Sequence, residues 1–267
     1  MPVDHYENFP VASILLPAPL REPVAAIYAF ARSADDFADE GHLPAAERTR
    51  RIDGYRAELD AIAAGRNTAH PIFQRLRPVI AAHGLPLQLF RDLLDAFSQD
   101  VTKTRYETYA ELLDYCRRSA DPVGRLLLHL FRAATPQNLS RSDCVCSALQ
   151  LINHWQDVAI DWNKPRLYLP REDLVRFGVT ADQIAAGRCD DNWRALMRFE
   201  VGRARTLMLE GAPLGRDLPG RIGLEIRAIV AGGLRILAKI EAVNYDIFCR
   251  RPVLTAWDWP LLLAKAL

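Results

Sequence analysis

Two short acidic segments contain the residues best suited to chemistry. In the first, which covers residues 33–40, Asp35 and Asp39 lie about one helical turn apart, roughly 6 Å along the axis. Carboxylates at the C-terminal end of a helix face the negative end of its dipole, so the pair costs stability unless a cation or solvent compensates. The simpler interpretation is a solvated helix end, in which Arg32 neutralises Asp35 and Asp36.

The second segment lies on an otherwise apolar stretch that ends at Asp161. Its polar residues fall on one face at helical spacing, and they are Gln150, Asn153, Asp157 and Asp161. The other positions are typical of a buried helix, and they include Leu149, Leu151, Ile152, Val158 and Ile160. Because a buried carboxylate needs a partner, we expect the polar face to contact a cation, a polar network or a water-filled cavity. A hydrogen-bonded network without a ligand is the alternative.

Two Asp pairs on separate helices favour a shared ligand. Oxygen ligands suit hard cations, and Mg²⁺ is typically held by one or two carboxylates together with water and substrate phosphates. We therefore expect a diphosphate site that uses Mg²⁺, with Mn²⁺ as a substitute ion. Basic residues near the two segments would complete it, although each is equally suited to a surface role: Arg32, Lys164, Arg166 and Arg171.

The composition excludes several other classes of protein. The chain has 267 residues, of which 50% are hydrophobic and 25% charged, so it is expected to fold. A net charge of +1 gives no general attraction to nucleic acid, and neither a phosphate-binding GxxxxGK[ST] loop nor a Rossmann GxGxxG motif is present. Five scattered cysteines without CxxC spacing argue against disulfides and structural zinc. Without a signal peptide or a long apolar run, we expect a soluble cytoplasmic protein that touches the inner membrane peripherally.

Apolar residues recur at three- and four-residue spacing along almost the whole chain, which predicts an all-α protein. We expect one domain over residues 1–267, with an irregular stretch at Arg166–Gly178. Gly232 and Gly233 fall within a helix, where they favour close packing. Helices are predicted over 20–40, 44–64, 69–83, 86–100, 107–134, 141–163, 180–186, 190–211, 219–249 and 254–265.

Several motifs along the chain resemble the head-to-head prenyl synthases, the squalene/phytoene synthase family. They are Tyr28-Ala-Phe-Ala-Arg32, Asp35-Asp36-x-x-Asp39, Tyr115-Cys-x-x-x-Ala120-x-x-Val123-Gly124, Gln150-x-x-Asn153-x-x-x-Asp157-x-x-x-Asp161, Arg166-x-Tyr168-Leu-Pro170 and Lys239-Ile-Glu241-x-x-Asn244-Tyr245. The resemblance implies an isoprenoid-synthase helical bundle with a central cavity, with Mg²⁺ on Asp35, Asp39, Asp157 and Asp161. The remaining catalytic candidates are Tyr115 and Gln156. The expected substrate contacts are Tyr28, Arg32, Asp36, Gln150, Asn153, Lys164, Arg166 and Tyr168.

Three departures from the family pattern narrow the expected activity. Gln156 replaces an Arg that usually precedes the first Asp of the second motif, Gly233 lies near a usual Tyr, and residues 7–13 replace an N-terminal His-Ser-x-Ser stretch. These differences resemble the hopanoid branch of the family, in which three proteins divide the synthesis of squalene. The chain is most similar to the member that turns presqualene diphosphate into hydroxysqualene, without NADPH. A lost charge and a lost ring would leave room for a water molecule that quenches the carbocation.

Other activities use the same motifs. A phytoene or dehydrosqualene synthase would differ in substrate and termination, a squalene synthase would need NADPH, and a non-catalytic relative could assist the assembly of a membrane complex. Transient contact with sister enzymes of the pathway is also compatible with the resemblance. The C-terminal run Leu254–Leu267 contains two Trp residues and an apolar tail, and we expect it to dock on the core, with contact with a bilayer as the alternative.

Overall fold

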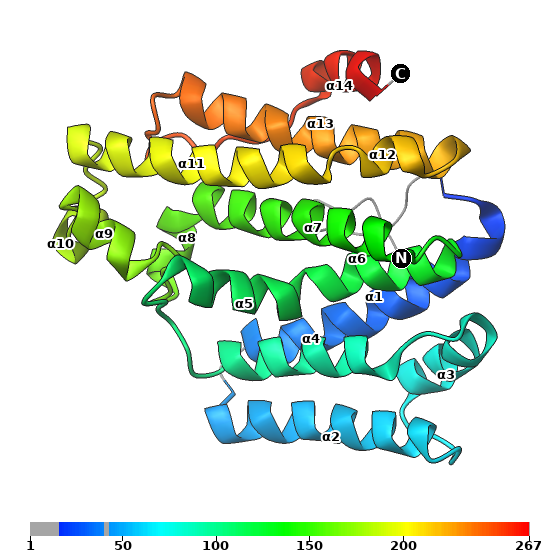
Figure 1. Cartoon of the computed structure of the whole chain (residues 1–267). Helices are drawn as coiled ribbons and strands as arrows, with labels where there is room; N and C mark the ends of the chain where they lie inside the picture. The colour runs from blue at the N-terminus through cyan, green and yellow to red at the C-terminus, as the bar shows by residue number, and fades with distance from the viewer. Residues whose placement is uncertain (1–15, 40–42, 267) are drawn as a thin grey trace. The chain divides into compact units, whose positions relative to one another are not determined.

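The computed structural model describes residues 16–39 and 43–266, apart from the side chains of Asp39 and Lys265, and its regular elements within these ranges are helices (Figure 1). The all-α prediction is confirmed. The N-terminal departure at residues 7–13 lies outside the described residues. The chain divides into two compact units, each described here by itself, and the single domain over 1–267 stays a prediction.

Unit 1 comprises residues 1–103 and 117–139 and contains α1 (Ala18–Asp39), α2 (Ala45–Ala63), α3 (Pro71–His83), α4 (Leu87–Asp100) and α6 (Asp121–Leu130). Helix α1 packs against α3 and α4, and α2 packs against α4. The core of this unit combines aliphatic side chains with a group of aromatic rings, in which the buried Phe30 ring lies 5.6 Å from Phe73 and 5.2 Å from Phe90, edge to face. This core fixes the helix that carries the first acidic motif.

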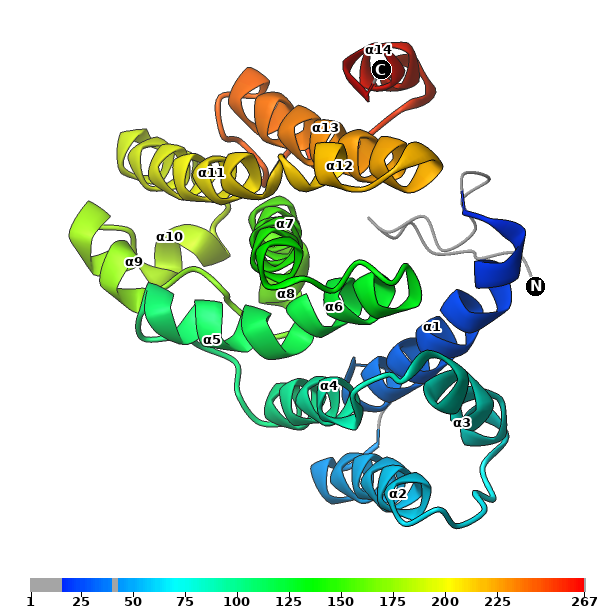
Figure 2. The same ribbon diagram turned by 45° about the vertical axis from the view of Figure 1, so that its right-hand side comes forward.

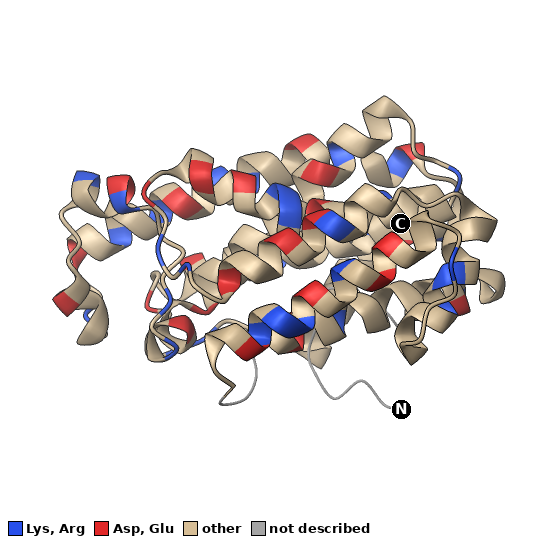
Figure 3. Ribbon diagram, turned by 90° about the horizontal axis from the view of Figure 1, so that it is seen from below, with Lys and Arg blue, Asp and Glu red and all other residues tan. Residues whose placement is uncertain are grey.

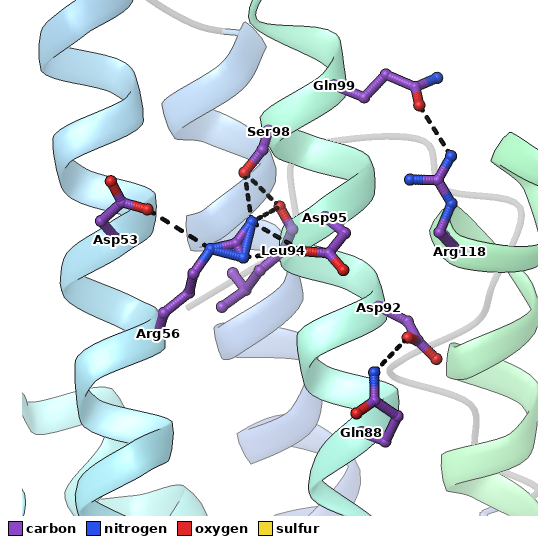
Figure 4. A network of polar contacts seen from close by, with 9 residues as sticks. All are labelled: Asp53, Arg56, Gln88, Asp92, Leu94, Asp95, Ser98, Gln99 and Arg118. Carbon is purple, nitrogen blue, oxygen red and sulfur yellow. Dashed lines mark hydrogen bonds and ion pairs between the residues drawn. The ribbon is translucent and has the colours of Figure 1, made fainter.

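Polar contacts join α2 to α4 at the surface of unit 1 (Figure 4). Arg56 lies 2.9 Å from Asp95, donates to the Ser98 hydroxyl at 2.8 Å, and lies 3.5 Å from Asp53. Partly exposed ion pairs of this kind add about 0–1 kcal/mol each. Acidic and basic residues are interspersed along the helices (Figure 3), in keeping with the net charge of +1.

Unit 2 comprises residues 104–116 and 140–267, and the chain passes between the units within α5 and α7. Helix α11 packs against α13, and Gly211 marks a close contact with α7, since a Cβ there would lie 2.6 Å from the Arg141 carbonyl oxygen. The helices of this unit are α5 (Tyr109–Ser119), α7 (Pro136–Gln156), α8 (Val158–Asn163), α9 (Arg171–Phe177), α10 (Ala181–Ala185), α11 (Asp191–Gly211), α12 (Leu214–Asp217), α13 (Gly220–Ala242), η1 (Ala256–Asp258) and α14 (Trp259–Ala266).

Several predicted helix boundaries are wrong. The helix expected over 107–134 is two helices, because a new helix, α6, begins at Asp121 after the N-cap Ala120, with Pro122 in its first turn. The stretch expected to be irregular contains α9, which begins after Pro170 and ends at Gly178 in the left-handed conformation. The helix expected over 219–249 ends at Ala242, where two residues with positive φ follow.

The C-terminal helix α14 docks on α13 (Figure 2), as expected. Its Leu262 and Ala266 side chains are buried. Arg227 donates a hydrogen bond to the Ala266 carbonyl. The other face of the segment exposes apolar side chains: Trp257, Trp259, Leu261 and Leu263. None of the helices in the described ranges has the length and apolar character to cross a bilayer.

Candidate active site

The first acidic motif lies at the C-terminal end of α1 in unit 1. Arg32 lies 3.7 Å from Asp35 and 2.8 Å from Asp36, so an ion pair within the helix offsets part of their charge. Both carboxylates are half-buried, and Tyr28 is half-buried two turns earlier. Asp39 is the last residue of α1, and its side chain is outside the described residues.

The second motif spans a break between two helices rather than one continuous helix. Asp157 leaves the helical conformation, with φ −107° and ψ 11°, and α8 starts at the next residue. The backbone bonds nevertheless continue, from the Asp157 N–H to the Asn153 carbonyl at 3.0 Å and from the Asp161 N–H to the Asp157 carbonyl at 2.8 Å. The prediction of a continuous helix over 141–163 is therefore wrong, and so is burial of Ile160, which is 46% exposed.

A segment from the C-terminal part of the chain holds both residues at this break. Arg251 donates to Asp157 from Nε to Oδ1 at 2.5 Å and from Nη2 to Oδ2 at 3.1 Å. The Gln156 amide donates to the Pro252 carbonyl at 2.7 Å. Gln156 is buried, and its Oε1 accepts no hydrogen bond from the part of the chain that the structure describes. The break thus coincides with these tertiary contacts.

Aromatic rings gather beside the second motif. The His154 ring stacks on Tyr168 at 3.6 Å and 10°, and Tyr106 stacks on the same tyrosine at 5.7 Å. Tyr115 lies 6.2 Å from His154 and 6.0 Å from Tyr168. The Gln150 amide lies 3.4 Å from His154 Nε2 and can only donate to it. Unit 2 therefore brings three expected site residues, Gln150, Tyr115 and Tyr168, together around an imidazole.

His154 is uncharged at neutral pH. Burial first, and the positive charge of Arg166 second, lower the pKa of its imidazole to about 3. Below about pH 6.5 the imidazole of His154 is protonated in the unfolded chain but stays neutral in the folded protein. The free energy of unfolding therefore falls as the pH falls toward 3. We expect wild type to lose about 2–3 kcal/mol from this group between pH 7.5 and 4.5.

Urea unfolding at the two pH values measures this loss, with His154→Phe as the matched variant that keeps a stacking ring. The variant should lose correspondingly less stability than wild type over the same range. Parallel losses in the two proteins would show that His154 takes no part in the acid sensitivity.

Basic residues follow the second motif closely. The N–H groups of Lys164 and Arg166 both donate to the Asp161 carbonyl at 2.9 Å, so the chain turns tightly around this residue. Lys164 is exposed and Arg166 half-buried. Arg171 instead pairs with Glu107 at 3.3 Å on the surface, which agrees with the simpler interpretation of that residue.

The donors of each motif suit a hard cation. No group of three or more His, Cys, Asp or Glu residues within the described ranges is gathered in the way a closed metal site requires. Mg²⁺ does not need one, since one or two carboxylates with water and substrate phosphates are its usual ligands. The half-buried Asp157 and Asp161 meet that requirement in unit 2, with Asn153 on the preceding turn.

Gly233 does not open space for a water molecule, and the prediction of room at this position is wrong. A Cβ at Gly233 would lie 2.6 Å from Met208 Cε, 3.3 Å from Ile152 Cδ1 and 3.4 Å from Leu149 Cδ2. Side chains of α7 and α11 fill the place where a larger residue would lie. The close packing predicted at this glycine is confirmed.

Sequence reasoning assigned no role to Arg251 or Tyr106. Arg251 lies 94 residues from Asp157, so no local pattern could pair them. Tyr106 precedes α5 in a region without helical periodicity. Only the tertiary structure brings each of them to the second motif.

Comparisons with known proteins identify relatives of the whole chain. Residues 3–258 match the squalene/phytoene synthase family. A hydroxysqualene synthase from Rhodopseudomonas palustris is 35% identical, covering 88% of this chain and 80% of that protein. A phytoene synthase from Arthrospira platensis is 30% identical over 97% of this chain and 88% of that protein.

Solved structures of related synthases also align with most of this chain. Squalene synthase HpnC from Alicyclobacillus acidocaldarius aligns with a TM-score of 0.84 and 40% identity, covering 90% of both chains. A dehydrosqualene synthase aligns with a TM-score of 0.79 and 25% identity, covering 94% of this chain and 87% of that chain. With a family match over nearly its whole length and both acidic motifs present, this chain belongs to the squalene/phytoene synthase family.

Proposed function

We propose that this isoprenoid synthase converts presqualene diphosphate to hydroxysqualene without a nicotinamide cofactor. Three hydroxysqualene synthases are 33–35% identical to it over 84–88% of its length. The observation that carries the proposal is the neutral aromatic group of Tyr106, Tyr115, His154 and Tyr168, which in unit 2 adjoins the helix turn that leads to Asp157. The carboxylates of the second motif and the basic residues after it suit a diphosphate with its metal ion, and the neighbouring aromatic rings suit a carbocation.

The expected reaction starts with departure of the diphosphate, which leaves a cyclopropylcarbinyl cation. Mg²⁺ ions, when bound, would neutralise the leaving group, and the residues expected to hold them are Asp35 and Asp39 in unit 1 and Asp157 and Asp161 in unit 2. Lys164 and Arg166 lie three and five residues after Asp161 and add positive charge for the diphosphate. Aromatic faces stabilise a nearby cation by about 0.5–2 kcal/mol each, and they exclude water while it rearranges.

Water ends the proposed reaction. The cation takes the water oxygen, one proton is released, and the products are an alcohol and diphosphate, so no reductant is consumed. Gln156 supports this ending, because its buried Oε1 accepts no hydrogen bond from any described residue and can accept one from water. An Arg in its place would offer only donors.

Incubation with Mg²⁺ and presqualene diphosphate, followed by mass spectrometry of the products, tests the proposal. We expect hydroxysqualene without NADPH, and little product from farnesyl diphosphate. Squalene that forms only with NADPH, presqualene diphosphate that accumulates from farnesyl diphosphate, or a dehydrosqualene or phytoene product would assign the chain to a sister activity. No turnover of any prenyl diphosphate would favour the non-catalytic assembly role.

We also propose that the C-terminal segment touches a lipid bilayer. Trp257 is 91% exposed and Trp259 54%, and these rings share the segment with Leu261 and Leu263. Trp is favoured at membrane interfaces because its ring is apolar and its N–H is polar. The C30 alcohol of the proposed reaction is apolar enough to partition into the bilayer.

Co-sedimentation with liposomes measures this contact. The double substitution of Trp257 and Trp259 by Ser should reduce the bound fraction at least about fivefold, and helicity should stay unchanged because both rings are exposed. Val175→Ser is the matched control, since Val175 is 74% exposed on α9. Equal binding by all three proteins would exclude the segment as a membrane contact.

A further inference from the structure

The Arg251–Asp157 contact has the geometry of an anion-binding site. The guanidinium uses two nitrogens on the two carboxylate oxygens, at 2.5 and 3.1 Å, and both side chains stay partly exposed, at 38% and 25%. The same planar fork fits two oxygens of a phosphate group. A partly exposed pair adds little stability, so folding alone does not account for this placement.

Gln156, the residue before Asp157, also contacts the C-terminal segment. Gln156 takes the position where the resemblance places an arginine, and its amide is held by the carbonyl of Pro252, the residue after Arg251. Two consecutive residues of the second motif therefore contact two consecutive residues of the C-terminal segment. The positive charge missing at position 156 is present in space, supplied by position 251.

The segment that carries Arg251 is anchored on both sides. Before it, Trp193 Nε1 donates to the Tyr245 carbonyl at 2.9 Å. After it, Lys239 Nζ donates to the Val253 carbonyl at 2.8 Å. These bonds hold the backbone on each side of Arg251, so its guanidinium is presented in a restricted region and less side-chain freedom is lost on binding.

We propose that Arg251 is a diphosphate-binding residue that supplies, from the C-terminal segment, the guanidinium that Gln156 lacks. Asp157 holds it in place before the substrate arrives. Each oxygen of Asp157 accepts one hydrogen bond from Arg251 and keeps a further lone pair for a cation. The positive charge of a bound cation repels the guanidinium and weakens its attraction to Asp157, so the guanidinium can turn to phosphate oxygens. This inference rests on the proposed diphosphate chemistry.

Calorimetric titration with inorganic pyrophosphate in the presence of Mg²⁺, and with Mg²⁺ alone, tests the proposal without turnover. Arg251→Ala should weaken pyrophosphate binding at least tenfold and leave the affinity for Mg²⁺ alone equal or higher, because Asp157 loses a competing cation. Arg251→Lys keeps the charge but not the planar fork of the guanidinium, and its affinity for pyrophosphate should lie between those of wild type and Arg251→Ala. Arg188→Ala removes an exposed arginine paired with Asp190 at 3.5 Å in the same unit, and should bind like wild type.

Four results would overturn the proposal. Arg251→Ala could bind pyrophosphate as wild type does, or Arg188→Ala could lose as much affinity, which would indicate a general charge effect. A parallel loss of Mg²⁺ affinity in Arg251→Ala would make the residue a support for Asp157 instead. Wild type that binds neither ligand would refute the diphosphate site itself, and with it the proposed function.

The double variant Gln156→Arg/Arg251→Ala tests whether an arginine at position 156 can replace the one at position 251. We expect part of the pyrophosphate affinity to return, because the guanidinium is moved to the helix position usual in the family. Helical circular dichroism identifies any variant that fails to fold, and Arg251→Lys keeps the test valid because it retains the cation at the partly exposed site.

Discussion

Single alanine substitutions in the two acidic motifs should reduce turnover of presqualene diphosphate at least about 10³-fold while helical circular dichroism stays unchanged. The residues are Asp35, Asp39, Asp157 and Asp161. The physical reason is that the described side chains among them are half-buried and polar, so they add little to packing, whereas the departing diphosphate needs its charge neutralised. Steady-state rates and circular dichroism on the same samples measure both effects.

Asp60→Ala is the matched control for these variants, because Asp60 is an exposed carboxylate paired with Arg91 at 2.9 Å. It should keep wild-type turnover. Removal of metal with EDTA should stop wild-type turnover, and added Mg²⁺ should restore it. Wild-type rates in two of the four acidic variants would refute the assignment of a metal site to these motifs.

The largest loss of stability is expected for Trp193→Ala, at about 4 kcal/mol. Trp193 is fully buried on α11, its ring lies 4.5 Å from Phe248, and its Nε1 donates to the Tyr245 carbonyl at 2.9 Å. The substitution leaves a large cavity and removes one of the two donors to the Tyr245 carbonyl, which also accepts from the Ile247 N–H at 3.0 Å. Because Tyr245 precedes the Arg251 segment, we also expect weaker pyrophosphate binding in whatever fraction stays folded.

Denaturant unfolding measures the loss, and Trp193→Phe separates its two causes. The phenylalanine fills most of the space but cannot donate, so about 1–2 kcal/mol of the loss should remain. Equal losses in the two variants would show that the hydrogen bond, and not the volume of the ring, accounts for the stability.

Local signals in the sequence predicted most of the helices because each depends on residues close together. The boundary between α3 and α4 follows from Gly84, which takes the left-handed conformation with φ 59°, and from Pro86, the N-cap of α4. Pro170 and Gly178 bracket α9 in the same way, but a seven-residue helix is too short to show apolar periodicity, so it was not predicted.

Other boundaries depend on contacts that are distant in sequence. Helix α13 ends before Asn244 and Tyr245, which have φ of 52° and 62°. The Trp193 side chain of α11 donates a hydrogen bond to the Tyr245 carbonyl. Asp157 interrupts the helix of the second motif where Arg251 and Pro252 contact it and Gln156. Neither effect can be read from helical spacing, because the partners lie 52 and 94 residues away.

The sequence by itself determined the all-α class, the family, and the residue types that suit a diphosphate and a hard cation, because helical periodicity and motif spacing are local properties. Only the tertiary structure decided that Arg251 binds Asp157 and that His154 lies buried and neutral against Tyr168, and it decided between the two sequence-based expectations at Gly233 in favour of close packing. Burial and long-range pairing set the charge state and the available partners of a group, and they exist only after distant segments have packed together.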